Sequence, residues 1–413
     1  MMSDTTPSAT KPKGRVLILV ENLSLPFDRR PWREALALRE AGYQVAAISP
    51  KGDTVDTAGH EVIDGVSIYR YRPFESTGGA VSYLIEYGVA MLMMGWLSLV
   101  VFVREGFDVI HLCNPPDTLI LLALPYKILG KRVVYDQHDL APDMYVMHKN
   151  GATGGFMYKA LRFFERLTYR GCDVIVTINE SYRQVALTRG GVPHEKTFVV
   201  RNGPDRASLK DVQPRPELRR GKPYLLAYVG MMGPQDGVDI LVRAVRHLID
   251  DFGRDDFHVH VMGGGTELER LKAYAAELGV AEYLTFTGRV PYAEVMVGIA
   301  SADVCVAPDP KTPLNDKANL VKVLEYMAMG KPLVAFDLCE VRYSAEDAAL
   351  YAKPNEEKDL AEKIHILLES PEMRERLGRI GKERILAGLT WDKSKEHLWE
   401  AYRAAFRMGD KTA

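Results

Sequence analysis

The stretch PLNDKANLVKVLEYMAMGKPLV, at residues 313–334, predicts a loop, a short helix, a glycine stop and a buried strand in succession. The apolar residues of its helix follow the i, i+3, i+4, i+7 spacing that turns one helix face toward a core, at Leu320, Val323, Leu324 and Met327. Gly330, followed by Lys331 and Pro332, is typical of a helix end. The segment therefore predicts one helix–strand step of an α/β fold.

Two charged residues, Lys322 and Glu325, lie three positions apart on the other face of this helix, so they point the same way. A cation near a helix start can meet phosphate oxygens, and a carboxylate one turn later can accept hydrogen bonds from two sugar hydroxyls. The alternative is a solvated ion pair without a binding role. The rest of the chain has to decide between these interpretations.

The same alternation of strands and helices extends in both directions from this stretch. In the first half we expect a helix at 32–41 and strands at 15–20, 43–49, 108–112, 131–136, 173–177 and 197–200. In the second half we expect strands at 224–229, 257–262, 283–286 and 303–307, and helices at 238–250, 267–278 and 293–300. Near-continuous valine and isoleucine runs suit parallel strands covered on both faces. The pattern predicts two doubly wound α/β domains in series.

The expected boundaries follow from changes in composition. They are a polar, disordered tail at 1–14, a first domain at 15–205, a linker at 206–222 rich in Pro, Arg, Lys and Asp, a second domain at 223–390, and an amphipathic helix within 391–413 that packs back on the first domain.

Composition excludes several classes of function. The net charge of −2 gives no general attraction to nucleic acid, so no nucleic-acid partner is expected. The four cysteines lie far apart in the sequence, which argues against a disulfide framework or a zinc site, at Cys113, Cys172, Cys305 and Cys339. Three aspartates of the second half, Asp303, Asp309 and Asp316, are too scattered to predict a magnesium site. We therefore expect no metal and a reducing, cytoplasmic location.

An uncharged apolar stretch at 87–103 has two interpretations. Its length is at the lower limit for crossing a bilayer, and a crossing here would separate strands of one sheet. It is either a long buried helix of the first domain or a helix whose Met, Leu and Trp side chains enter a lipid surface. The second is favoured by the flanking basic residues Arg104, Lys127, Lys131 and Arg132.

Short motifs recur in a fixed order along the chain: DVIH at 108–111 with NPPD at 114–117, YDQHDL at 135–140, RNG at 201–203, YVG at 228–230 with DGVD at 236–239, GGG at 263–265, FTG at 286–288 and LEYMAMGKP at 324–332. With these motifs, from about residue 15 to 406, the chain resembles the family-4 retaining glycosyltransferases of the GT-B fold. The resemblance implies two Rossmann-like doubly wound domains that face each other across an interdomain cleft.

The resemblance also implies roles for individual residues. The second domain would bind a UDP- or GDP-linked sugar, with Glu325 on the ribose hydroxyls and no further cofactor. The other donor-binding residues would be Gly230, Gly263, Gly265, Arg289, Asn315, Lys317 and Lys322. His138 would contact the donor sugar, so His138 and Glu325 are the candidate catalytic residues. The alternatives are a tight strand-to-helix turn for the glycines, and a turn contact with Asp136 and Asp139 for His138.

The sequence departs from the family pattern at two points. Lys317 occupies the position where many members carry a second glutamate, eight residues before Glu325. The loop at 230–237 contains no Lys or Arg, although many members have a basic pair there. Other cations or N–H groups must then neutralise the diphosphate. The first candidate is Lys322, and the others are Lys317, Arg289 and the N–H groups of the helix start at Gly237.

The expected function is metal-independent, retaining transfer of a sugar from a nucleotide-diphosphate sugar to a lipid-linked saccharide or glycan. The expected setting is bacterial cell-surface polysaccharide synthesis, with the protein peripherally bound to the inner leaflet of the cytoplasmic membrane. The alternatives are a nucleotide-sugar epimerase or hydrolase of the same two-lobed architecture, and a non-catalytic donor-binding subunit.

Overall fold

A computed structural model of the protein describes residues 12–52, 54–74, 80–149, 151–209 and 212–407. The chain divides into two compact units, which are Met1–Val200 with Lys395–Ala413, and Arg201–Ser394. Most of the expected N-terminal tail, two residues of the expected linker and the last residues of the C-terminal segment lie outside the described residues.

The first unit is built on an eight-stranded sheet in the order β3-β4-β2-β1-β5-β6-β7-β8. Its strands are β1 (Arg15–Val20), β2 (Gln44–Pro50), β3 (His60–Ile63), β4 (Val66–Tyr71), β5 (Val109–Cys113), β6 (Arg132–Gln137), β7 (Val174–Thr177) and β8 (Thr197–Val199). Its helices are α1 (Arg29–Glu40), α2 (Ala80–Arg104), α3 (Ile120–Ile128), α4 (Ala141–His148), α5 (Phe156–Gly171), α6 (Glu180–Thr188) and, from Lys395 onward, α14 (Trp391–Arg407).

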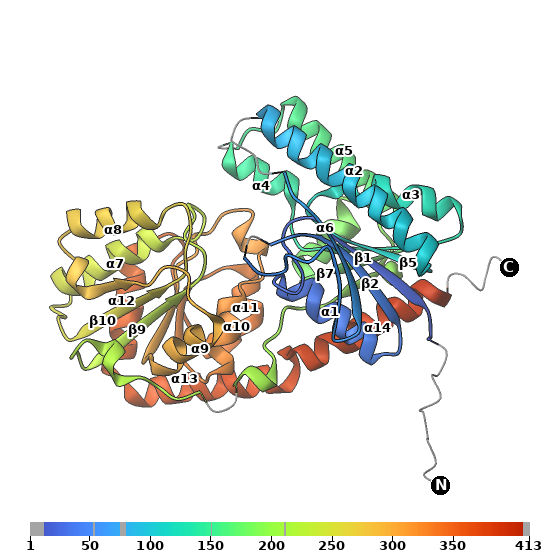
Figure 1. Ribbon diagram of the computed structural model, residues 1–413. Helices are drawn as coiled ribbons and strands as arrows, with labels where there is room; N and C mark the ends of the chain where they lie inside the picture. Colours follow the sequence, from blue (N-terminus) through green and yellow to red (C-terminus); the bar gives the residue numbers. More distant parts are fainter. Residues whose placement is uncertain (1–11, 53, 75–79, 150, 210–211, 408–413) are drawn as a thin grey trace, which may run out of the picture. The chain divides into compact units, whose positions relative to one another are not determined.

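Helices cover both faces of this sheet. Figure 1 shows α2, α3 and α5 together on one side of the strands, with α1 and α14 on the other. Every residue of β5 is buried, as are all but the first residue of β1, β2 and β6. Strands buried on both faces lose the in–out alternation of an exposed sheet, which explains their continuous apolar runs.

The hairpin of β3 and β4 at one edge of the sheet was not expected from the sequence. The two strands pair antiparallel around Asp64 and Gly65, which have positive φ angles of 45° and 73°. An Asp-Gly pair between strands is a strong hairpin signal because both residues tolerate this backbone conformation. The signal was present, but β3 is short and half exposed, so it lacks an apolar pattern.

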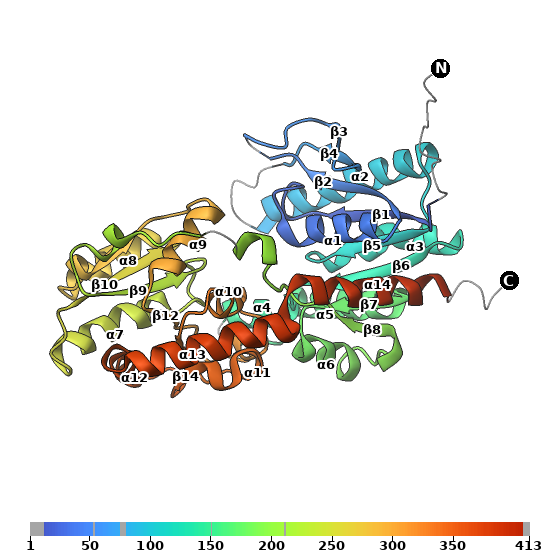
Figure 2. The same ribbon diagram turned by 90° about the horizontal axis from the view of Figure 1, so that it is seen from below.

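The second unit has a six-stranded parallel sheet in the order β11-β10-β9-β12-β13-β14. Its strands are β9 (Tyr224–Val229), β10 (Phe257–Met262), β11 (Leu284–Phe286), β12 (Val304–Ala307), β13 (Leu333–Phe336) and β14 (Ala349–Ala352). Its helices are α7 (Val238–Asp250), α8 (Leu268–Glu277), α9 (Tyr292–Ser301), α10 (Val321–Ala328), α11 (Cys339–Ala345), α12 (Glu357–Glu369) and α13 (Pro371–Arg384), several of which are seen from below in Figure 2.

The two sheets confirm the predicted doubly wound α/β class. In each unit the strand order reverses at one point, between β1 and β5 in the first and between β9 and β12 in the second. Loops leave such a point in opposite directions, so a crevice opens at the carboxyl ends of the strands, where ligands of this fold class bind. The switch point of each unit is therefore the place to look for a functional site.

Candidate functional site

A buried lysine lies at the switch point of the second unit. The ammonium of Lys322, on α10, is 2.8 and 3.0 Å from the two carboxylate oxygens of Asp309, which follows β12. It also lies 4.6 Å from the ring centroid of Tyr228, on β9. Lys322 is 8% exposed and Asp309 is 2% exposed. A buried ammonium needs a partner, so the carboxylate of Asp309 fixes this positive charge at the carboxyl end of the sheet.

Glu325 lies one turn after Lys322 on the same helix and is 6% exposed. The sequence placed both residues on the face opposite the apolar stripe, and in the structure this face is buried as well. The solvated ion pair considered above does not describe these two residues.

Glycines let the loops after β9 and β10 touch each other. Gly263 has a φ of 135°, and a Cβ added there would lie 1.8 Å from the carbonyl oxygen of Gly230. A Cβ on Gly265 would lie 2.4 Å from the carbonyl oxygen of Met232, and one on Gly230 would lie 3.1 Å from the ammonium of Lys322. The N–H groups of Gly230 and Gly263 donate to protein carbonyls. These glycines therefore serve close packing of the loops around Lys322.

The remaining candidate donor residues occupy different surroundings. Asn315 is 5% exposed, and its amide donates to the carbonyl oxygens of Gln235 at 2.8 Å and Pro310 at 3.0 Å, so it ties the loop after β9 to the loop after β12. Lys317 ends the same short turn and is half-buried. Arg289 follows β11 and is exposed. Of the candidate donor residues, Gly230, Gly263 and Lys322 thus lie next to one another in the structure.

In the first unit His138 directly follows β6, at the carboxyl end of the sheet. The side-chain oxygen of Asn114, just after β5, accepts from the backbone N–H groups of His138 at 2.6 Å and Asp139 at 3.1 Å. The amide nitrogen of Asn114 donates to the carbonyl oxygen of Asp139 at 2.8 Å and to Asp117 at 3.1 Å. The NPPD motif at 114–117 therefore holds the histidine loop, a role that sequence reasoning missed.

The ring of His138 is in hydrogen-bond contact, through Nε2, with Oδ2 of Asp136, and 18% of its side chain is exposed. Asp136 is fully buried. The contact with Asp136 that was considered as an alternative role is present. It leaves part of the ring accessible, so the contact is compatible with a role for His138 in the reaction.

Asp136 is held in turn by a buried arginine. Arg30, on α1, donates from Nε and Nη2 to the two carboxylate oxygens of Asp136, at 3.0 and 2.7 Å. Nη2 of Arg30 also lies 3.1 Å from Glu34. Burial raises the pKa of Asp136, but the charges of Arg30 and His138 outweigh it and hold that pKa well below its usual range. Burial and the neighbouring Asp136 charge raise the pKa of Glu34 well above its usual range.

The same cluster has the residue types of a metal site. Glu34, His111, Cys113 and Asp136 offer ligand atoms within 4.8 Å of one another. Burial, followed by the Asp136 charge, raises the pKa of the Cys113 thiol well above its usual range. The guanidinium of Arg30 already lies against both carboxylates. Arg30 therefore supplies the positive charge of this cluster.

The opposite pKa shifts predict opposite effects of removing each charge. The folded-state pKa of Glu34 is raised above the ordinary value of 4.5, so its contribution to stability is complete below that value and is lost as pH rises. The folded-state pKa of Asp136 is lowered below 3.8, so its contribution is present above that value and is lost in acid. We expect Asp136→Asn to lower the free energy of unfolding by about 3–5 kcal/mol at pH 5 to 8, because it leaves the buried charge of Arg30 without its ionised partner.

Glu34→Gln is the matched variant on the other side of Arg30. It should match the wild type at pH 4, below the ordinary value of 4.5, and become more stable than the wild type at pH 8. Urea unfolding at both pH values measures the difference. Equal destabilisation by both variants at pH 8 would contradict the assignment of charges.

Comparison with known proteins gives the family. A family described as "Glycosyltransferase Family 4" matches residues 32–208, and one described as "Glycosyl transferases group 1" matches residues 210–384. A D-inositol 3-phosphate glycosyltransferase from Nocardia farcinica is 30% identical over 254 residues, which is 55% of this chain and 54% of that protein. The alignment thus spans about half the length of this curated relative.

Other similarities extend over most of the chain. An uncharacterized glycosyltransferase from Methanocaldococcus jannaschii is 24% identical over 383 residues, covering 89% of this chain and 91% of that protein. The solved sucrose-phosphate synthase from Thermosynechococcus elongatus superposes with a TM-score of 0.75 at 19% identity, covering 96% of this chain and 100% of that one. The structural match shows the GT-B fold. Together, the two family matches show that this chain belongs to the family-4 (group 1) glycosyltransferases of the GT-B fold.

Proposed function

We propose that this protein transfers a sugar from a nucleotide-diphosphate sugar, UDP- or GDP-linked, to a lipid-linked saccharide or glycan of the bacterial cell surface. One observation carries the proposal. Lys322 and Glu325 are both buried, one turn apart, at the switch point of the second unit. A site of this fold class that holds a lysine and a glutamate together suits a diphosphate next to a ribose.

Lys322 would supply the positive charge next to the diphosphate, because the loop at 230–237 lacks the basic pair that many family members carry. An ammonium has three donor hydrogens, and the contacts of Lys322 with Asp309 at 2.8 and 3.0 Å are shorter than its 3.4 Å contact with the Tyr228 hydroxyl. A phosphate oxygen would replace this longest contact without breaking the ion pair. Lys322 would then stabilise the charge that develops on the leaving diphosphate.

The transfer is proposed to retain the anomeric configuration and to need no metal. The carboxylate beside the proposed phosphate position, Asp309, is engaged by Lys322 at 2.8 Å, whereas Mg²⁺ sites depend on carboxylates that are free to coordinate. Burial also raises the pKa of nearby Asp236 above its usual range, which makes it a poorer metal ligand. The first unit is proposed to bind the acceptor and to contribute His138 to the reaction.

A lipid surface is proposed to present the acceptor, because the first unit has an apolar outer face. Helix α2 contains a segment, Ile85–Arg104, that is long and apolar enough to cross a membrane. Only 22% of its most apolar 18-residue stretch is buried. The outer face of α2 and its neighbours α3 and α5 carries large exposed apolar side chains, namely Ile85, Tyr87, Leu92, Met93, Trp96, Leu99, Val103, Leu121, Ile128, Leu129, Phe156, Met157 and Phe163.

The charges of this outer face indicate an anionic membrane surface. On α5, aromatic and basic side chains are both exposed at helical spacing, at Phe156, Lys159, Phe163, Arg166 and Arg170. The three helices contain two acidic residues, Glu86 and Glu165, and neither is exposed. Three of the basic residues expected to flank the surface are ion-paired with Asp173 or Asp108, namely Lys127, Lys131 and Arg132, so α5 supplies more of the exposed charge. An apolar face bordered by cations is typical of a peripheral membrane protein.

Donor binding can be tested by thermal shift with a panel of nucleotide sugars. We expect one of them to stabilise the wild type by about 2.7 kcal/mol at a hundredfold excess over its Kd. Lys322→Met and Glu325→Ala should remove this stabilisation. Lys331→Met, which removes a half-buried lysine just beyond the helix stop, is the control and should keep it. Wild-type shifts in both site variants would remove these residues from the donor site.

The reaction can be tested by incubating the donor with and without lipid-linked acceptors from bacterial membranes. We expect release of nucleoside diphosphate only with an acceptor, at the same rate with a chelator, and a new linkage with the anomeric configuration of the donor by NMR. Consumption of donor alone would indicate an epimerase or hydrolase. Donor binding without release with any acceptor would indicate a non-catalytic subunit.

Membrane contact can be tested by sedimentation with vesicles that contain anionic phospholipid. We expect the wild type to bind at low salt and a Leu92→Ser, Trp96→Ser variant to remain in solution, because these side chains are 77% and 63% exposed. Val62→Ser, at a position on β3 that is 62% exposed, is the control and should bind like the wild type. A wild type that ignores the vesicles would refute the lipid surface.

A further inference from the structure

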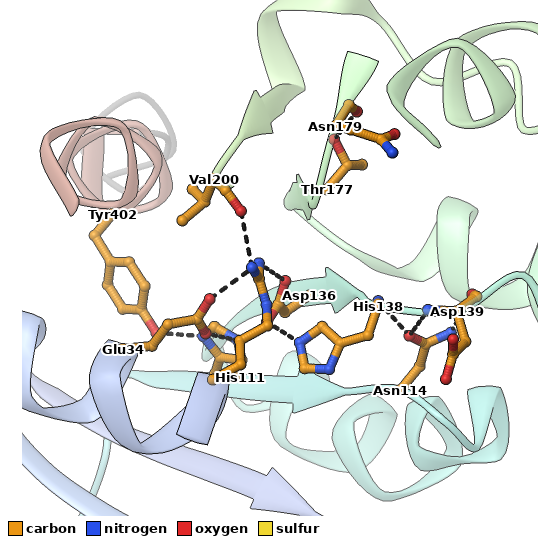
Figure 3. A network of polar contacts seen from close by, with 11 residues as sticks. Glu34, His111, Asn114, Asp136, His138, Asp139, Thr177, Asn179, Val200 and Tyr402 are labelled. Atoms are coloured by element: carbon orange, nitrogen blue, oxygen red, sulfur yellow. Dashed lines mark hydrogen bonds and ion pairs between the residues drawn. The ribbon is translucent and has the colours of Figure 1, made fainter. Parts of the chain in front are cut away.

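A buried chain of side chains connects His138 with the last helix of the protein. His111, on β5, is fully buried, and its Nδ1 lies 2.7 Å from the hydroxyl of Tyr402, on α14. Its Nε2 lies 3.8 Å from Oδ2 of Asp136. The ring of His138 contacts this same oxygen. Figure 3 shows Tyr402, His111, Asp136 and His138 in this succession.

Electrostatics select one tautomer of His111. Burial lowers the pKa of this imidazole, so the ring is neutral. Its Nε2 faces Glu34 at 3.5 Å and Asp136 at 3.8 Å. A lone pair on Nε2 would be repelled by the ionised carboxylate of Asp136, whereas an N–H there is attracted to it. The proton therefore belongs on Nε2, and Nδ1 is left to accept a hydrogen bond.

Tyr402 is suited to hold that tautomer. Burial raises the pKa of its hydroxyl well above the usual range, so the group stays protonated and donates to Nδ1 of His111. Removing this hydroxyl frees His111 to place its proton on Nδ1 and to turn its lone pair toward Asp136. The orientation of Asp136, which is set by the groups around its carboxylate, would change with it.

The cluster is not the arrangement that maximises stability. Within the described part of the chain, the buried carboxylate oxygens of Glu34 and Nε2 of His111 make no contact with hydrogen-bond geometry. Their contacts are an ion pair of Glu34 with Arg30 at 3.1 Å and longer approaches of Nε2 to Glu34 and Asp136, at 3.5 and 3.8 Å. Replacing buried charged groups by apolar ones is often neutral or stabilising, and buried polar groups left unpaired are uncommon. A costly arrangement that ends on a partly exposed histidine indicates a functional role.

We propose that Tyr402 and His111 are positioning residues, which hold Asp136 and thereby the ring of His138 for the transfer reaction. The proposal rests on the function proposed above, in which His138 takes part in the reaction. Tyr402 and His111 are fully buried and act only through Asp136. A residue close to the end of the chain would thus set the geometry of a side chain at the carboxyl end of the first sheet.

The first test observes His138 itself and needs no substrate. In the full-length protein with 13Cε1-labelled histidine, the signal of His138 is the one lost in His138→Gln. We expect Tyr402→Phe and Asp136→Asn to shift this signal. The matched control is Tyr126→Phe, which removes another buried hydroxyl of the same unit, 2.9 Å from Ser98, and should leave the signal in place. An unmoved His138 signal in Tyr402→Phe would overturn the proposal.

The second test measures transfer once the donor and acceptor are known. Tyr402→Phe should lower kcat on the order of tenfold to a hundredfold with an unchanged donor KM, because misplacing a reacting group affects the chemical step. Tyr126→Phe should keep the wild-type kcat. A shifted His138 signal with an unchanged kcat would overturn the positioning role. Absence of transfer by the wild type would instead refute the proposed function, and the His138 signal would still report on the contacts.

Discussion

In both units a cation is buried against an aspartate near the carboxyl ends of the strands, and the rest of each candidate site is arranged around this pair. Lys322 lies against Asp309 in the second unit, and Arg30 lies against Asp136 in the first. Transfer of either charge out of water costs several kcal/mol, and only a close partner compensates for it. The pairs therefore fix the position of a charge at the switch point, where a doubly wound sheet binds its ligands.

Side-chain amides hold the loops that surround these pairs. Asn114 binds the backbone of His138 and Asp139 in the first unit, and Asn315 binds the carbonyls of Gln235 and Pro310 in the second. Glycine contributes in a different way, since Gly263 lets two loops approach more closely than any side chain allows. The strand ends thus present fixed groups, as catalysis by electrostatic stabilisation requires.

The outer helices of the first unit follow a different rule from the rest of the protein. Helix α2 buries residues such as Met94 and Val101 against the sheet, yet its outward positions, among them Trp96 and Leu99, are equally apolar. Covering the sheet requires only the first set. The second set has no role in the core of this unit, and a lipid surface would account for it.

The sequence by itself determined the order of strands and helices, the helix that ends at Gly330, and the family, because apolar spacing, glycine stops and short motifs are local properties. It also singled out Lys322 and Glu325, but it left open whether they form a ligand site or a solvated ion pair. Only the tertiary structure decided that both residues are buried, that Asp309 pairs with Lys322, and that Asn114 holds the loop of His138. It also brought Tyr402 to His111 across 291 positions of the chain. Such partners depend on the order of strands in a sheet and on the return of a distant helix, and no local pattern of residues encodes either.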